Sequence, residues 1–85
     1  MPRFDALVEV QLRAGVADPQ GATIERALPA LGFEGITEVR SGKAFRLSVE
    51  AADDETARKR VDELCRRFLT NPVIEDSIVT IRADR

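Results

Sequence analysis

A strict alternation of apolar and polar residues near the start of the chain predicts a first strand. From Phe4 to Arg13, apolar side chains occupy nearly every second position and charged or amide side chains lie between them. This two-residue period is typical of a strand with one buried and one exposed face. Leu7 is the apolar residue on the otherwise polar face. It is either an isolated surface leucine or a sign that another chain covers this face of the sheet.

A helical period follows the first strand. Asp18 is a candidate N-cap, and Pro19 stands at the first helical position, where its missing N–H costs nothing. Gly32 is placed to end the helix in a left-handed conformation, and Pro29 predicts a kinked or irregular last turn. The apolar face of this helix is formed by Ile24, Ala27, Leu28 and Leu31.

The middle of the chain is predicted to form a hairpin. Residues 36–41 and 44–51 are two strand-like runs separated by the polar turn Gly42-Lys43. In the second run, Phe45, Leu47 and Val49 alternate with polar residues. The alternative is one long bent strand with a bulge at Gly42, since glycine inside a strand often marks a bulge.

The second helix has the clearest signals at its two ends. Acidic residues 53–55 crowd its first turn and Arg66 and Arg67 lie in its last, which suits the helix dipole. Asn71-Pro72 is expected to stop it. Its predicted buried stripe is Val61, Leu64, Cys65, Phe68 and Leu69.

A last strand is predicted from about Val73 to Arg82. There Ile78 and Val79 are adjacent, so they face opposite ways unless a bulge intervenes. The order of strand, helix, two strands, helix and strand predicts an α+β fold of the ferredoxin-like βαββαβ type, with an antiparallel sheet and two helices on one face.

Length and composition narrow the class of protein. Eighty-five residues predict a single domain over residues 1–85, because so short a chain cannot divide into two cores. The sequence has one cysteine and no histidine, which argues against an intrachain disulfide and a zinc site.

A net charge of −2 is too small to suggest a nucleic-acid or membrane surface. With neither a signal-peptide pattern nor a long apolar run, a cytoplasmic location is expected. A core of this size often needs a partner subunit, so self-association is expected.

Few residues in the chain suggest chemistry of their own. Without histidine, the most frequent base for activating a nucleophile is missing, and Cys65 is interpreted as a packing residue. Gly42-Lys43 does not fit a phosphate-binding loop, because Ala44 lacks the hydroxyl that would reach magnesium. Chemistry alone therefore predicts a small interaction domain.

Three short polar stretches occur where one predicted element passes to the next: residues 18–21, 39–43 and 71–76. In this order and at this spacing, they resemble the PurS family, the small subunit of phosphoribosylformylglycinamidine (FGAM) synthase in purine biosynthesis. The resemblance covers residues 4–82. Pro29 and Ser77 depart from the usual family pattern, but they lie outside the three stretches.

The resemblance implies a non-catalytic subunit that forms a homodimer or a dimer of dimers. It would bridge a glutaminase subunit and a large ATP-dependent synthetase subunit and assist ammonia transfer between them. No catalytic, cofactor or metal residue is expected on this chain, and ATP and magnesium would bind to the synthetase subunit. The interface residues that the resemblance implies are Asp18, Pro19, Gly21, Arg40, Gly42, Lys43, Asn71, Val73, Ile74, Glu75 and Asp76, with Val39 also matching the family motif. The alternative is a stand-alone ferredoxin-like regulatory module that binds a small effector at a dimer interface.

Overall fold

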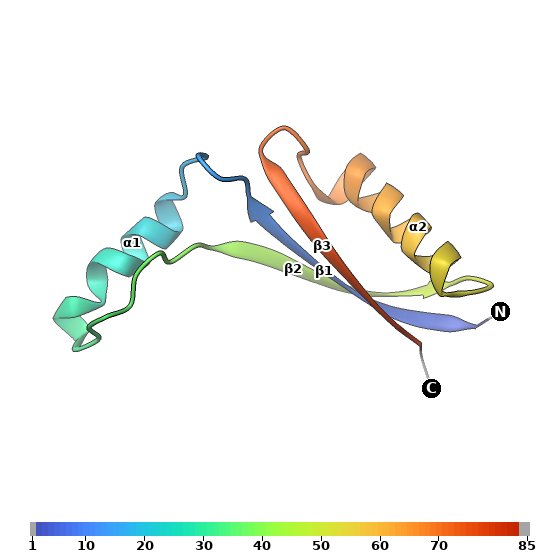
Figure 1. The fold of residues 1–85 in the computed structure, drawn as a ribbon, viewed down its shortest axis with the longest axis horizontal. Helices are drawn as coiled ribbons and strands as arrows, with labels where there is room; N and C mark the ends of the chain where they lie inside the picture. Colours follow the sequence, from blue (N-terminus) through green and yellow to red (C-terminus); the bar gives the residue numbers. More distant parts are fainter. Residues whose placement is uncertain (1, 84–85) are drawn as a thin grey trace.

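The structure, a computed structural model, describes residues 2–83 and consists of a three-stranded antiparallel sheet with helices. Figure 1 shows a long twisted sheet with α2 lying over it and α1 projecting beyond one end. The strand order is β2-β1-β3. The elements are β1 (Arg3–Leu12), α1 (Pro19–Ala27), the 3₁₀ turn η1 (Pro29–Leu31), β2 (Gly42–Glu50), α2 (Asp54–Leu64), the π-helical turn η2 (Cys65–Leu69) and β3 (Glu75–Ala83).

Strand β1 is the centre of the fold, and its alternation explains the core. One of its faces is buried through Phe4, Ala6, Val8 and Val10. Both neighbouring strands pair with β1 along most of its length, so that Val8 lies between Phe45 of β2 and Val79 of β3. The strand predicted over residues 4–13 is therefore confirmed within one residue at each end. Its other face carries the half-exposed Leu7, which lies between Arg46 and Thr80.

The first helical segment, which consists of α1 and the following 3₁₀ turn, begins and ends at the predicted residues but lies outside the core. Asp18 is its N-cap, Pro19 is its first residue, and Gly32 has the left-handed φ of 91° that ends the following turn. Helix α1 ends at Ala27, and Pro29 is the first residue of the 3₁₀ turn. The predicted irregular last turn is therefore confirmed. We call residues 16–41 the α1 arm, because Figure 1 shows them extending away from the sheet.

Two parts of the predicted architecture are wrong. Residues 36–41 form neither a strand nor one side of a hairpin, and β2 begins at Gly42, so the bent-strand alternative is wrong as well. Of the two helices, only α2 covers the sheet. The antiparallel α+β class is confirmed, and the order of the elements is consistent with a ferredoxin-like chain.

Helix α2 packs over the sheet through a stripe with a spacing of four residues. Ala57, Val61 and Cys65 are buried and Leu69 is half-buried, which confirms three of the five predicted stripe residues. The α-helix ends at Leu64, and the chain then widens into the π-helical turn, where Thr70 N–H donates to the Cys65 carbonyl. Leu64 and Phe68 were predicted to be buried but are 37% and 82% exposed.

Strand β3 confirms the predicted last strand, with its start at Glu75 instead of Val73. Ile78 is 51% exposed on the open face, whereas Val79 packs against the core, so the two adjacent residues do face opposite ways. Among the helices in residues 2–83, none combines the length and the apolar character needed to span a bilayer.

Candidate functional site

The three polar stretches meet at one end of the sheet. Strand β1 ends at Leu12, and Gln11 lies opposite both Gly42 at the start of β2 and Asp76 near the start of β3. The α1 arm leaves the sheet from the same end, as Figure 1 shows. We call residues 18–21, 39–43 and 71–76, together with Arg13, the junction.

Asp18 is the central side chain of the junction. Its Oδ1 accepts hydrogen bonds from the Gly21 N–H (3.0 Å) and from the Ser41 hydroxyl (2.6 Å), and its Oδ2 accepts from the Ser41 N–H (2.6 Å). The side chain therefore caps α1 and also ties it to the segment that returns to the sheet. These hydrogen bonds, those from Ser41 above all, lower the pKa of Asp18 from its ordinary value of 3.8 to about 2. The carboxylate is ionised at neutral pH.

Two glycines allow the chain to pass closely at the junction. A Cβ on Gly21 would lie 2.6 Å from the Val39 carbonyl oxygen, and a Cβ on Gly42 would lie 2.6 Å from that of Val10. Neither distance is compatible with a side chain unless the backbone shifts. The Val39 N–H donates to Glu25 Oε1 at 2.9 Å, which ties the returning segment to α1 a second time.

Two arginine side chains connect the arm, the loop after β1 and the start of β3. Arg40 reaches back to the loop after β1, where its guanidinium donates to the carbonyls of Val16 (3.4 Å and 3.5 Å) and Arg13 (3.5 Å). Arg13 in turn forms an ion pair with Asp76, with a separation of 3.3 Å between Nε and Oδ1. Its backbone N–H also donates to the Ile74 carbonyl at 2.8 Å.

The third stretch forms a tight turn before β3. The carbonyl of Asn71 accepts from the N–H groups of Ile74 (3.1 Å) and Glu75 (2.8 Å), and Asn71 Oδ1 accepts from the Val73 N–H (3.1 Å). In turn, Glu75 Oε1 accepts a hydrogen bond from the Asn71 N–H (2.7 Å). Its Oε2 lies 3.7 Å from Lys43 Nζ, and that nitrogen is 5.9 Å from the ring centroid of Phe45. Lys43 thus links the second and third stretches.

The junction contains no side chain poised for catalysis among the described residues. The Asp18 carboxylate is fully engaged by donors, and its lowered pKa makes it a poor base near neutral pH. Cys65 lies in the core beneath α2, where burial raises the pKa of its thiol, so it is not an activated nucleophile. Residues 2–83 contain no group of three or more His, Cys, Asp or Glu placed to hold a metal ion. The arrangement positions the arm and presents side chains for contact.

The structure brings the eleven predicted contact residues into one region, although sequence reasoning placed them only at separate turns. The roles of Asp18, Pro19 and Asn71 in local capping and turning agree with the sequence interpretation. Gly42 is not in a hairpin turn, as was predicted, but is the first residue of β2 packed against β1. Val73 is 80% exposed, which leaves it available to a partner. The contact role of the set stays a prediction.

Sequence reasoning missed three side chains that hold the junction together. Ser41 completes the hydrogen bonds of Asp18, Arg13 bridges to Asp76, and Glu25 binds the returning backbone. Each partner is distant in the sequence, and the separation of 23 positions between Asp18 and Ser41 leaves no local pattern to detect. Only the polar character of residues 39–43 hinted at such a contact.

Comparison with known proteins identifies the family. Residues 5–83 match the family described as PurS, phosphoribosylformylglycinamidine (FGAM) synthase. The chain belongs to the PurS family. The resemblance carried by the three stretches is thereby confirmed.

Named relatives of the family align with nearly the whole chain. The PurS subunit of phosphoribosylformylglycinamidine synthase from Methanocaldococcus jannaschii is 40% identical over 86% of this chain and 88% of its own length. The corresponding subunit from Mycobacterium leprae is 43% identical over 88% of this chain and 91% of its own.

Solved PurS structures share the fold. The crystal structure of the purS subunit from Thermotoga maritima matches with a TM-score of 0.88 and 38% identity, covering 95% of this chain and 93% of that one. A chain in the structure of PurLQS from the same organism matches with a TM-score of 0.89 and 39% identity, covering 96% and 100%. The three-stranded sheet with two helices is therefore a PurS fold.

Proposed function

We propose that this chain is the small, non-catalytic subunit of phosphoribosylformylglycinamidine synthase in purine biosynthesis, where it bridges a glutaminase subunit and an ATP-dependent synthetase subunit and assists ammonia transfer between them. The observation that carries the proposal is the end-to-end match to PurS subunits, including a chain within the PurLQS structure. These matches favour a subunit over a stand-alone effector-binding module. The site of action would be cytoplasmic.

The chemistry of the described residues supports an accessory role. Ammonia passed between two active sites must be kept from bulk water, and a protein that closes an interface can do this without reactive groups of its own. The junction offers such a surface, because its charged side chains are mostly exposed while its backbone is held by hydrogen bonds. ATP and magnesium would be bound by the synthetase subunit, and this chain would hold neither.

Self-association is part of the proposal, and the dimensions of the chain support it. The radius of gyration is 16.5 Å, whereas a compact domain of this length has a radius of about 12 Å. The cause is the projecting α1 arm, which carries four exposed apolar residues: Ile24, Leu31, Phe33 and Ile36. The β2 side of the sheet meanwhile leaves Phe45, Leu47 and Val49 only partly buried. A second copy would bury both surfaces if each arm packed against the other protomer's sheet.

Reconstitution tests the proposed function directly. The purified chain should hydrolyse neither glutamine nor ATP, and its addition to the glutaminase and synthetase subunits of the same cell should restore glutamine-dependent synthesis. The measurement is product formation with each subunit omitted in turn. Equal synthesis with and without the chain would contradict the proposal, as would turnover of either substrate by the chain alone.

Two junction variants sharpen this test. Arg40→Ala and Lys43→Ala should raise the concentration of chain needed for half-maximal synthesis while changing the melting temperature little. The Lys43 side chain is 53% exposed although that of its partner Glu75 is only 16% exposed, and surface ion pairs contribute about 0–1 kcal/mol to stability. Lys59→Ala is the matched control, since Lys59 also forms a surface ion pair, with Glu55 at 3.4 Å, but lies away from the junction. Parallel losses of stability and synthesis would instead assign Arg40 and Lys43 a structural role.

A further inference from the structure

The outer end of α2 carries an aromatic side chain turned away from the core. Phe68 is 82% exposed although it lies in a run whose neighbours pack against the sheet. The cause is the π-helical turn: its i→i+5 hydrogen bond keeps Leu69 against the core next to Cys65, and Phe68 then lies outside the buried stripe. Such turns are rare, and when they occur they are frequently at functional sites.

Phe68 lines a shallow groove with four other residues of the same helical run. The groove has a volume of about 380 Å³ and is formed by Arg60, Glu63, Leu64, Arg67 and Phe68, which we call the Phe68 surface. Leu64 adds a second partly exposed apolar side chain at 37%. The surface therefore has an apolar centre with charged side chains around it, the arrangement found at the centres of protein interfaces.

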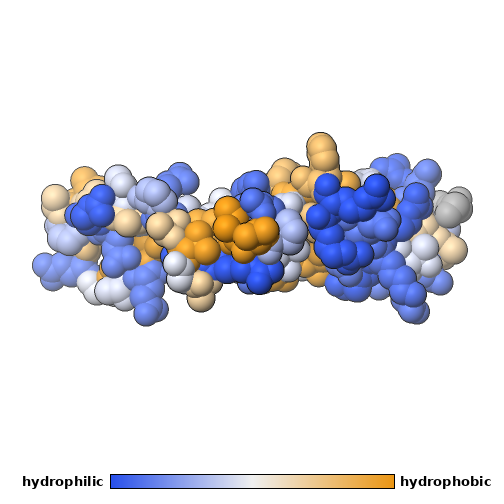
Figure 2. Space-filling model, turned by 90° about the horizontal axis from the view of Figure 1, so that it is seen from above, coloured by the Kyte–Doolittle hydropathy of each residue, from blue (hydrophilic) through white to orange (hydrophobic). Residues whose placement is uncertain are grey.

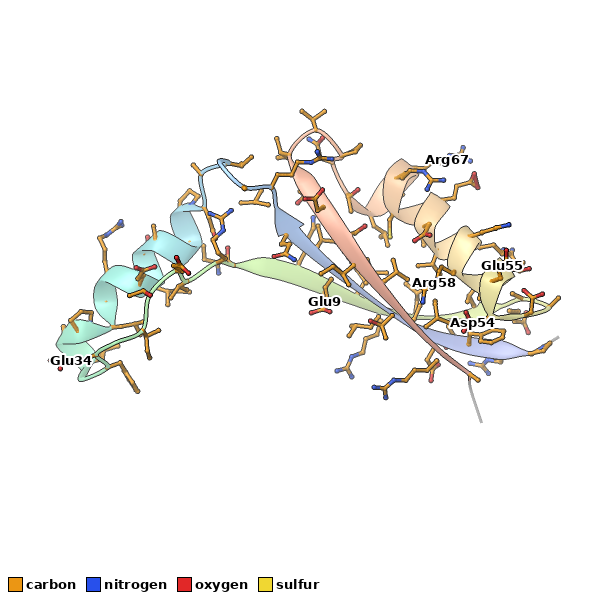
Figure 3. The ribbon with its side chains drawn as sticks, viewed as in Figure 1. Glu9, Glu34, Asp54, Glu55, Arg58 and Arg67 are labelled. Carbon is orange, nitrogen blue, oxygen red and sulfur yellow. The ribbon has the colours of Figure 1, made fainter. Side chains whose placement is uncertain are left out.

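Two of the three charged side chains around Phe68 are basic, Arg60 and Arg67, and the third is the acidic Glu63. Arg60 is held at the edge of the sheet, because its Nη1 donates to the Glu50 carbonyl at 2.7 Å. Arg67 projects away from the sheet in Figure 3, and within residues 2–83 it makes no ion pair or side-chain hydrogen bond. In Figure 2 the outer side of α2 is strongly hydrophilic. The helix dipole explains why cations lie at this end, but it does not explain an exposed phenylalanine among them.

We propose that the Phe68 surface docks a partner protein whose own surface presents an apolar pocket bordered by carboxylates. The proposal rests on the proposed function, since the partner would be one of the two larger subunits. A second copy of this chain fits less well. A two-fold contact centred on Phe68 would bring together two arginines from each copy, Arg60 and Arg67, with only one Glu63 per copy to offset them, and an excess of like charge opposes association.

The residue types are those that dominate binding energy at interfaces. Aromatic and arginine side chains are enriched among the few residues whose truncation costs most of the affinity. Phe68 would supply the buried anchor, and Arg67 would supply electrostatic attraction that speeds association and weakens with salt. This surface shares no residue with the junction, so the chain would have two sets of contact residues, as a bridging subunit requires.

Binding of the full-length chain to each purified larger subunit tests the proposal. Phe68→Ala should weaken binding to one of the two by at least about tenfold, because a buried aromatic anchor typically contributes more than about 1.4 kcal/mol. Arg67→Glu should weaken binding to the same subunit and reduce its dependence on salt. Ile78→Ala is the matched control, since Ile78 is 51% exposed on the open face of the sheet. All three variants should keep the wild-type melting temperature within a few degrees.

The outcomes separate this inference from the proposed function. If the wild-type chain binds neither larger subunit, alone or in the mixture of all three, both the proposed function and the inference are overturned. If the wild-type chain binds but Phe68→Ala binds equally well, only the inference is overturned. A loss of self-association in Phe68→Ala, with unchanged binding to both subunits, would assign the surface to a second copy and also overturn the inference.

Discussion

Two aspartates are helix N-caps, but they differ in how many parts of the fold their side chains hold together. Asp53 Oδ1 accepts the Thr56 N–H, at 2.8 Å, and starts α2, and its hydrogen bonds stay within the first turn of that helix. Asp18 starts α1 in the same way but uses both carboxylate oxygens to hold Ser41 as well. The local role of each could be predicted from the sequence, because an N-cap depends on the next three residues. The tie to Ser41 could not, since it depends on the path of the α1 arm.

Replacement of Asp18 by Asn is expected to loosen the junction. The two oxygens of Asp18 face three donors, so either orientation of an amide would direct its NH₂ group toward a donor. Asp53→Asn is the control, because Asn caps a helix about as well as Asp and Asp53 binds only within its own helix turn, to Thr56. Thermal unfolding should therefore give a lower melting temperature for Asp18→Asn than for Asp53→Asn. Equal melting temperatures would show that the tie to Ser41 contributes nothing.

The same carboxylate predicts a dependence of stability on pH. The pKa of Asp18 is about 2 in the folded chain, below its ordinary value of 3.8, so the stabilisation from its ionised form is complete by about pH 5 and is lost as the pH falls through 3.8 toward 2. The difference in unfolding free energy between the wild-type chain and Asp18→Asn should thus shrink between about pH 5 and pH 2. Denaturation measured across this range checks it. A difference that stays constant with pH would mean that ionisation of Asp18 does not stabilise the fold.

At the scale of whole elements, local signals predicted helices better than they predicted strands. Asp18, Pro19 and Gly32 set the limits of the first helical segment correctly, because each acts within a few residues of the chain. Residues 36–41 looked like a strand but have no neighbouring strand to pair with, and pairing is a property of the fold. Phe68 fitted the period of about 3.6 residues for a regular helix, and the π-helical turn changed that period.

The eleven contact residues could be proposed only through the family resemblance, but their proximity follows from the sheet. Glu75 and Asp76 begin β3, and Gly42 and Lys43 begin β2, on either side of the end of β1. The antiparallel register of both outer strands therefore brings the second and third stretches together. The first stretch joins them because β1 leads directly into it. No periodicity along the chain contains this information, since it arises from the order β2-β1-β3.

The shape of the whole molecule is that of a subunit with surfaces left open for a partner, because the α1 arm projects from the sheet (Figure 1). Its dimensions are 52 × 30 × 14 Å, and its sheet is covered by a single helix. Figure 1 shows the α1 arm, with Glu34 labelled near its tip in Figure 3, reaching beyond the sheet without a layer of the same chain beneath it. An arm of this kind, held at its base by Asp18 and Glu25, is suited to pack against another copy.

Substitutions at the tip of the arm should therefore weaken self-association. Leu31→Ser and Phe33→Ser replace side chains that are 68% and 53% exposed in the single chain, so neither should disturb its own core. If these side chains are buried against a second copy, each substitution removes roughly 1.5–3 kcal/mol of association free energy per protomer, through lost apolar burial.

Sedimentation at micromolar concentration should show a wild-type dimer or larger assembly and a shift toward monomer in both variants. Phe68→Ala serves as the control, because Phe68 is 82% exposed and lies after the other helix, so its loss should leave self-association intact. A wild-type chain that is monomeric at these concentrations would contradict self-association through the arm.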